Sequence, residues 1–496
     1  MGLGNQFLNM KVEISMASRW SSPGGYREVL KIAGPMILSM GSWSLMHFID
    51  RVFLTWFSAD ALAATLPAGL LSFAFGSFFI GTAGYVNTFV AQYYGAGRFD
   101  QIGRAVWQGI YFSVAAGVLM LALVPCAHWI FEKAGHAESI RLLEVTYFQI
   151  LTAGIGATFV MSAASTFFSG RGDTMTVLWV NVAVVALNMG LDYAWIFGFW
   201  GFPKAGVAGA GYATVLAQTL GAVLFLFLMF QRAFRQKYRT DAWRFDPKLF
   251  ARLWKFGAPN GLQFMVEVFS FTLFVLLVGR IGAIELAATN LAFNINSLAF
   301  IPLLGVSVAV STLVGQYLGD DNPGPAERST YSALTLTFLF MAFMAFCFGF
   351  LPEVFMIPFE LGADGETFVP VRDMAIVLLR FVAVYCIADA CYLIFSAAVK
   401  GAGDTRFVMW VTGTASVAFL MIPTYLVVVV FKLGLYAAWG IMTLYIALMG
   451  LVFFLRFRQG KWKSMRVIEP HAVSAALGIE AGEVLVLGNV HEVQRF

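Results

Sequence analysis

The sequence is poor in charged residues. Asp, Glu, Lys and Arg together make up 12% of its 496 residues, whereas 59% are hydrophobic. A soluble domain carries about 25% charged residues, and its core could not absorb this excess of apolar side chains. The composition therefore excludes an ordinary water-soluble protein and indicates a chain that crosses a membrane several times.

Residue types that carry chemistry are also scarce. The chain has four Cys and five His, and no His/Cys grouping has the spacing of a metal site. There is no nucleophile with an adjacent base, no phosphate-binding loop of the Walker type and no loop long enough to hold a catalytic centre. We therefore expect a protein that is not an enzyme, needs no cofactor and does not use ATP directly.

What the sequence does contain is a series of long apolar runs. Each can cross a hydrocarbon layer of roughly 30 Å as a helix, and none shows the alternation of barrel strands. These runs predict an all-α polytopic membrane protein with twelve transmembrane helices. The segments lie near residues 30–55, 64–92, 104–127, 144–168, 175–199, 207–231, 256–279, 287–316, 330–351, 373–399, 406–431 and 434–455.

The chain also contains one long stretch twice. Ala59–Thr65 returns as Ala283–Thr289, and the same offset places Val90–Gly95 on Val314–Gly319. Two further pairs follow: Ala33-Gly-Pro35 falls on Gly257-Ala-Pro259, and Gly170–Thr174 matches Gly401–Thr405 after an insertion of about seven residues. Such a long fixed period indicates a tandem of two homologous halves.

Six segments per half is an even number, so both halves enter the membrane in the same direction. We therefore expect two six-helix lobes related by a pseudo-twofold axis along the membrane normal. The predicted organisation is a cytoplasmic N-terminal segment (1–29), an N-lobe (30–231), a basic cytoplasmic linker (232–255), a C-lobe (256–457) and a cytoplasmic tail (458–496).

Basic residues are distributed unequally between the two sides of the membrane. Loops on the side of both termini hold most of the Lys and Arg, among them Arg171 and Lys400, the linker 232–255 and the stretch Arg456–Arg466. The opposite side holds only Lys133, Arg141, Lys204, Arg280, Arg372 and Lys432, with Arg51 at the border. The positive-inside rule then places both termini in the cytoplasm. Residues 1–25 do not resemble a cleavable signal, and we expect a multi-pass protein of the cell (inner) membrane.

Ionisable side chains inside the apolar segments are expensive and mark candidate functional sites. In the N-lobe, Asn188 and Asp192 are four residues apart and share a helix face, and Asp50 lies at a similar depth in the first segment. Together they could hold one ion. Alternatively, Asp50 and Arg51 form an interfacial cap while Asp192 reaches the outer surface. His47, one turn before Asp50, is more typical of a packing residue than of a proton carrier.

The C-lobe carries a second acidic set. Glu267 and Asp389 lie near the middle of the seventh and tenth segments, with Tyr385 one turn before Asp389. Two central carboxylates beside a phenol indicate a cation or proton site; the alternative is that each is simply hydrogen-bonded between helices. Arg380 lies nearer the outer side. It either pairs with one of these carboxylates or extends outward, and the sequence leaves both alternatives open.

The repeat does not extend to these charges. Glu267 falls on Trp43, Asp50 on Phe274, Asp389 on Thr158 and Asp192 on Pro423. The sequence therefore predicts that the fold is duplicated while each lobe has its own acidic group.

The doubled Leu-Ala-Ala-Thr, Val-x-Gln-Tyr-x-Gly and Gly-x-Gly-Asp-Thr segments resemble those of multidrug and toxic compound extrusion (MATE) transporters. The likeness covers residues 27 to about 457. It implies twelve helices in two lobes and efflux of organic cations driven by inward Na⁺ or H⁺. Glu267, Tyr385 and Asp389 are similar to the C-lobe site of the NorM-like branch, and Asp50 to the first-helix aspartate of the family.

Asn188 and Asp192 look like the N-lobe site of the DinF-like branch, with Thr214 resembling its sixth-helix partner. Because the chain carries both sets, the resemblance leaves open which lobe couples transport and which ion is used. We expect a secondary active exporter of cationic or amphipathic organic compounds, acting in the lipid bilayer as a monomer without nucleic acid. The alternative is a flippase for lipid-linked saccharide precursors from the same superfamily, which would place several Arg or Lys in the cleft.

Overall fold

The computed structural model describes residues 19–134, 136–360 and 365–469, and every regular element in them is a helix. Twelve helical spans are long and apolar enough to cross a membrane, which confirms the predicted number. The N-lobe is built from α2 (Tyr26–Phe57), α3 (Ala59–Gly84) with α4 (Val86–Gly95), α5 (Phe99–Met120), α7 (Glu138–Ser169), α8 (Thr174–Phe197) and α9 (Gly206–Met229).

The C-lobe repeats this order. It consists of α11 (Pro247–Gly279), α12 (Ala283–Gly319), α13 (Pro323–Phe350), α15 (Gly365–Ala402), the eleventh span and α18 (Leu435–Arg458). The eleventh span combines α16 (Thr405–Ala415), a π-helical turn at Ser416–Met421, α17 (Ile422–Tyr425) and a second π-helical turn at Leu426–Val430.

Helix starts follow the repeat closely. The two Leu-Ala-Ala-Thr segments open α3 at Ala59 and α12 at Ala283. In each lobe a short helix that the hydropathy pattern did not predict precedes the fourth span: α6 (Ala127–Ala134) and α14 (Pro352–Glu360). One difference is internal, because the second span breaks at Tyr85 whereas its counterpart α12 is continuous.

The predicted linker is shorter than expected. A short helix, α10 (Arg232–Tyr238), occupies its first part, and α11 begins at Pro247 rather than near residue 256. Asp246 accepts hydrogen bonds from the backbone N–H groups of Lys248 and Leu249 (3.0 and 3.1 Å). An Asp cap followed by Pro at the first helical position is a strong helix start, so α11 begins well before its apolar run.

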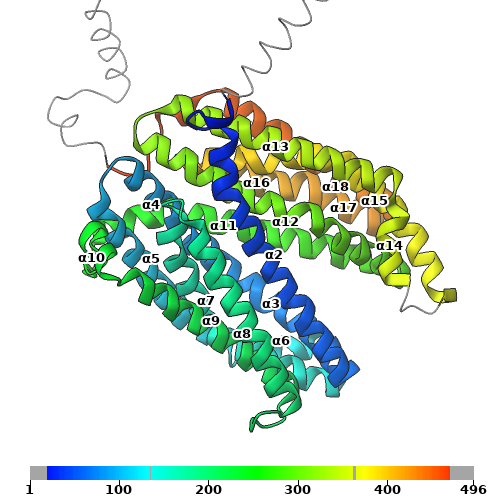
Figure 1. Ribbon diagram of the computed structural model, residues 1–496. Coiled ribbons are helices and arrows are strands. Elements are labelled where there is room, and N and C mark those ends of the chain that lie inside the picture. Colours follow the sequence, from blue (N-terminus) through cyan, green and yellow to red (C-terminus); the bar gives the residue numbers. More distant parts are fainter. Residues whose placement is uncertain (1–18, 135, 361–364, 470–496) are drawn as a thin grey trace, which may run out of the picture.

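The lobes lie side by side, meet at the end that carries Gly24 and Glu469, and diverge toward the other end, as Figure 1 shows. We call these the terminal end and the far end. Most hydrogen bonds between the lobes in the described ranges lie at the terminal end, for example Asn87 to Thr312 and Tyr85 to the Lys400 carbonyl. The bond from Asn260 of α11 to the Gly81 carbonyl of α3 (2.8 Å) lies farther along these helices, where they cross.

Contacts between the lobes occur in pairs that are related by the pseudo-twofold axis. A Cβ atom at Gly81 would lie 2.9 Å from Cα of Gly261, and one at Gly305 would lie 2.7 Å from the backbone nitrogen of Ile37. The repeat relates Gly81 to Gly305 and Ile37 to Gly261, so α3–α11 and α2–α12 are equivalent contacts. Glycine permits these helices to approach closely.

The beginning of the predicted tail is part of the folded structure. Lys461–Glu469, which we call the strap, runs from the end of α18 across the terminal end. Trp462 is buried and stacks on Phe457 (4.8 Å between ring centroids), and Arg466 pairs with Asp321 at the end of α12 (3.0 Å). Residues 470–496 and 1–18 lie outside the described part.

Candidate functional site

The N-lobe acidic residues form a buried cluster between α2 and α8. Asp50, Asn188 and Asp192 are all buried, the last two completely. The two carboxyl groups are neighbours, and Asn188 lies beside Asp192. A hydrogen bond from Asn181 to Ser39 (2.6 Å) holds the same two helices together nearer the terminal end. The structure therefore brings together the three residues that the sequence placed in one site.

This cluster lacks partners for its polar atoms. Both carboxylate oxygens of Asp192, one of Asp50, and the side-chain nitrogen and oxygen of Asn188 are buried without a hydrogen-bond partner among the described residues. Buried polar groups in proteins are nearly always satisfied, and leaving them unpaired costs about 1–3 kcal/mol each, more for charged groups. The donor set is rich in oxygen, which suits a hard cation such as Na⁺ or one or two protons.

Three residues that the sequence placed near the N-lobe cluster make few contacts with its polar atoms. His47 is exposed, with its Nδ1 atom 4.0 Å from an Asp50 oxygen, and Arg51 is exposed as well. Thr214 is half-buried on α9, and its hydroxyl donates to the Ala210 carbonyl of its own helix (3.0 Å). Tyr147 of α7, which the sequence did not single out, is buried near both aspartates.

The C-lobe acidic residues lie on α11 and α15. Asp389 and Tyr385 are buried, and Glu267 is half-buried. Glu267 is close enough for its charge to act on Asp389, so the structure brings the predicted set together. The carboxylate of Glu267 accepts a hydrogen bond from the hydroxyl of Tyr392, one turn after Asp389.

The sequence pattern did not identify several polar residues that surround Glu267. Lys400, assigned to a loop, ends α15 and turns its ammonium inward to Gln263 of α11 (3.4 Å). Tyr445 of α18 is buried near Glu267 and shares a hydrogen bond with Ser416 (3.0 Å), and Ser416 opens a π-helical turn. Such turns are frequent at functional sites. The one available signal was the spacing of Tyr385, Asp389 and Tyr392 along one helix face.

The structure shows the surroundings of two arginines, Arg380 and Arg171, that the sequence did not reveal. Arg380 is exposed and forms no ion pair with the residues that the structure describes, so it does not neutralise Glu267 or Asp389. Arg171, counted among the loop charges, packs over the rings of Phe167, Phe234 and Tyr238 at 4.0–4.7 Å. It joins the end of α7 to α10 by cation–π contacts.

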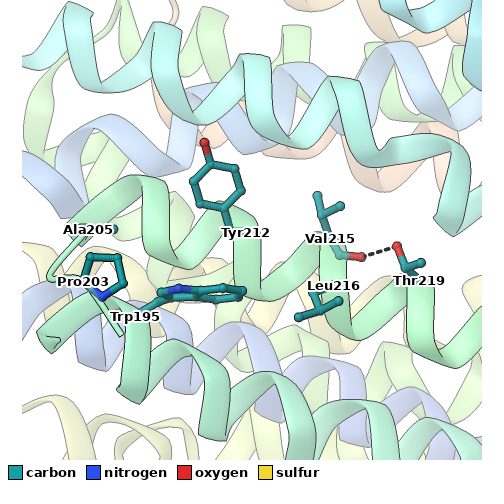
Figure 2. A pocket seen from close by; sticks show the side chains of 7 residues that line it. All are labelled: Trp195, Pro203, Ala205, Tyr212, Val215, Leu216 and Thr219. Carbon is teal, nitrogen blue, oxygen red and sulfur yellow. Dashed lines mark hydrogen bonds between the residues drawn. The ribbon is translucent and has the colours of Figure 1, made fainter. Parts of the chain in front are cut away.

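An apolar groove of about 490 Å³ lies on the N-lobe between the end of α8 and α9. Figure 2 shows its lining, in which Thr219 donates to the Val215 carbonyl of its own helix. The other lining residues are Trp195, Pro203, Ala205, Tyr212 and Leu216. Because none of them is charged and none belongs to either acidic cluster, the groove does not provide an ion site.

Twelve membrane spans in two equivalent lobes, each with an acidic cluster, are the architecture of a transporter of the parallel-repeat class. The family model MatE matches residues 35–194 and 259–426. The chain therefore belongs to the MatE family. Its members are transporters rather than enzymes, and they need no cofactor.

Curated relatives are similar over most of the chain. A probable multidrug resistance protein NorM of Thermotoga maritima is 25% identical over 451 residues, covering 89% of this chain and 94% of the relative. One from Bradyrhizobium diazoefficiens, with the same description, is 28% identical over 391 residues, covering 77% and 82%.

Solved structures share the fold. A transporter of the MOP superfamily from Pyrococcus furiosus superposes with a TM-score of 0.79 at 20% identity, covering 90% of this chain and 98% of the other. The outward-facing conformation of a multidrug resistance MATE family transporter gives the same values. At this identity the likeness establishes the fold alone.

Proposed function

We propose that this protein exports cationic or amphipathic organic compounds in exchange for inward Na⁺ or H⁺, by alternating access of its two lobes. The observation that carries the proposal is the set of buried, unpartnered polar atoms in Asp50, Asn188 and Asp192. The multidrug resistance proteins that match most of the chain support the same function.

The two acidic clusters have different roles in this scheme. In the C-lobe, Glu267 accepts a hydrogen bond from Tyr392, and Lys400 is a nearby cation of the chain itself. The N-lobe aspartates have no hydrogen bond from Lys or Arg among the described residues. We therefore assign the coupling ion first to the N-lobe cluster. The C-lobe set Glu267, Tyr385 and Asp389 is the second site, which exchanges a proton or ion with the organic cation.

Coupling follows from thermodynamic linkage. If ion binding weakens the affinity for the exported compound, that compound weakens ion affinity by the same factor. An inward gradient of the ion then drives the compound outward. In this scheme the terminal end faces the cytoplasm of the cell (inner) membrane, and the basic residues of Arg232–Tyr238 and of the strap support that orientation. A monomer contains both lobes and is the proposed unit.

A flippase for lipid-linked saccharide precursors is not favoured. Such a substrate carries a pyrophosphate and would need several cations facing the cleft. Near the C-lobe carboxylates, Lys400 is bonded to Gln263, and Arg380 is exposed and forms no ion pair with the residues that the structure describes.

The test is transport of a fluorescent organic cation in proteoliposomes with Na⁺ and pH gradients imposed separately. We expect one of the two gradients to drive accumulation against the concentration gradient of the dye. Glu267→Gln and Asp389→Asn are expected to abolish driven transport, whereas Asp60→Asn, an exposed aspartate at the start of α3, is the matched control. Equal uptake with and without either gradient in the wild-type protein would contradict the proposal.

A further inference from the structure

The Val-x-Gln-Tyr-x-Gly segments occur twice, and neither acidic cluster includes them. Val90–Gly95 forms the second half of α4, and Val314–Gly319 ends α12. Both lie at the terminal end, where the lobes meet. Gln92 is fully buried, and Gln316 is half-buried.

Each glutamine of the pair binds the opposite lobe. The side-chain nitrogen of Gln92 donates to the Gly401 carbonyl (3.0 Å), and that of Gln316 donates to the Gly170 carbonyl (2.8 Å). Gly170 and Gly401 are the first residues of the two Gly-x-Gly-Asp-Thr turns. Each repeated motif therefore binds the other motif across the lobe boundary, once in each direction.

The backbones of the two segments also touch reciprocally. A Cβ atom at Gly95 would lie 1.8 Å from the carbonyl oxygen of Gln316, and one at Gly319 would lie 2.1 Å from the carbonyl oxygen of Gln92. Neither distance is possible for a real side chain. Glycine at the end of each segment is therefore required for this closure, which explains why both motifs end in Gly.

We propose that Gln92 and Gln316, with Gly95 and Gly319, form a reciprocal latch that closes the terminal end in this conformation and is released when that end opens. The proposal rests on the alternating access proposed above, which requires the terminal end to open once per cycle. A latch made of hydrogen bonds suits that requirement, because water replaces a broken hydrogen bond at a small net cost. Gln92 and Gln316 are positioning residues: they act on the gate and not on ion or substrate.

The strap makes the two halves of the latch unequal, because it binds Gln92 but not Gln316 among the described residues. The side-chain oxygen of Gln92 accepts a hydrogen bond from the backbone N–H of buried Val467 (2.8 Å). Gln92 thus joins both lobes and the strap, while Gln316 joins the lobes only. Loss of Gln92 is expected to open the terminal end more than loss of Gln316.

The experiment measures the gate directly and without substrate. Spin labels are placed at Asp100 and Arg406, exposed residues at the first turns of α5 and α16, in a background lacking Cys126, Cys347, Cys386 and Cys391. Distances between the labels are measured by electron–electron double resonance in lipid nanodiscs. The variants are Gln92→Ala and Gln316→Ala.

The matched control is Gln108→Ala. Gln108 is fully buried at the same end, and its side chain bonds to Arg104, Arg244 and Asp246 within the N-lobe and the linker. We expect Gln316→Ala to raise the population of molecules with a widened terminal end about fivefold, because the variant loses one hydrogen bond between the lobes and the net contribution of such a bond corresponds to about this factor. Gln92→Ala should raise it further, and Gln108→Ala should not change it.

A second pair of variants tests the close approach. Gly95→Ala and Gly319→Ala keep every hydrogen-bonding group but obstruct the contact, and they should widen the terminal end as well. Gly34→Ala on α2, where a Cβ atom would meet nothing within 4 Å, should not. If the glutamine and glycine variants leave the distance distribution as in their controls, the latch is disproved.

Failure of the proposed function would look different. In that case neither ion gradient drives the wild-type protein in proteoliposomes, although the spin-label distances still respond to Gln92→Ala and Gln316→Ala. Conversely, intact gradient-driven transport together with unresponsive distances would overturn the latch alone.

Discussion

The acidic side chains of the two lobes differ in the groups that surround them. Glu267 accepts a hydrogen bond from Tyr392, and the ammonium of Lys400 lies in the same region. Asp192 is completely buried and has neither a donor nor a cation bonded to it among the described residues. A charge left in this condition is costly, so the N-lobe cluster should bind its ion or proton even when no substrate is present.

We predict that Asp192→Asn removes ion binding without loss of the fold. In the wild-type protein, the coupling ion should raise the midpoint of thermal unfolding, because a ligand that binds only the folded state stabilises it. The variant should show no such rise, and its midpoint without the ion should be at or above that of the wild type. Thermal unfolding in detergent, titrated with Na⁺ at fixed pH and with H⁺ at fixed Na⁺, checks this. Asp100→Asn, which is exposed, is the control; an ion response retained by Asp192→Asn would contradict the assignment.

Tyr392→Phe tests the C-lobe set. Loss of a hydrogen bond to a charged group costs about 1.5–3 kcal/mol, so Glu267 should hold H⁺ or Na⁺ more tightly by on the order of tenfold or more. Release then slows and driven efflux falls, while the ion response of thermal unfolding stays. Tyr436→Phe, an exposed tyrosine of α18, should behave as the wild type. Unchanged efflux by Tyr392→Phe would remove Tyr392 from the site.

At the scale of elements, the strap links parts of the chain that the repeat does not relate. Its last described residue, Glu469, pairs with Arg98 (3.1 Å), which precedes α5, and with Arg252 of α11, and it accepts a hydrogen bond from Tyr93 (3.0 Å). Burial would raise the pKa of Glu469, but its backbone N–H, Arg252 and Tyr93 outweigh burial and lower it below the ordinary 4.5.

We predict that docking of the strap does not depend on pH between about pH 6 and 8. Because the pKa of Glu469 is lowered in the docked state, its contribution is complete above the ordinary value and is lost only as the pH falls through the docked value. Mobility of a spin label at exposed Ser464 should therefore stay constant in this range. It should increase in Glu469→Ala but not in Asp241→Ala, an exposed aspartate of the linker. A transition near pH 7 would contradict this.

The sequence predicted the spans because apolar length is a local property, and it predicted the pseudo-symmetry because the motifs recur in order. The interior of the C-lobe was less accessible. No spacing along the chain relates Tyr392 on α15 to Glu267 on α11, and Lys400 looks like a loop charge until the helix end turns it toward Gln263. The extension of α11 had a local signal in Asp246-Pro247, which the basic character of the linker obscured.

At the scale of the whole molecule, the contacts define one state. Hydrogen bonds between the lobes in the described ranges are concentrated at the terminal end, and the helices diverge toward the far end (Figure 1). If both termini are cytoplasmic, as proposed, this arrangement is the outward-open one. That orientation is the remaining expectation from the distribution of Lys and Arg.

Single cysteines in a cysteine-free background test the orientation. Arg239, exposed in the linker, should react with a membrane-impermeant maleimide only from the cytoplasmic side. The loop around Gly362 should react from outside, but it lies beyond the described residues, so Glu353 on α14 is the better position. It is exposed at the far end. Reaction of both positions from the same side of the membrane would contradict the topology.

The reciprocal contacts of Gln92 with Gly401 and of Gln316 with Gly170 have a consequence for the origin of the chain. A contact in which one patch meets its own equivalent is isologous, as in a homodimer with twofold symmetry. Both lobes enter the membrane in the same direction, so two copies of a single six-helix ancestor could have formed this interface before a linker joined them. On this hypothesis the proposed latch is older than the fusion, whereas the acidic clusters, which differ between the lobes, diverged after it.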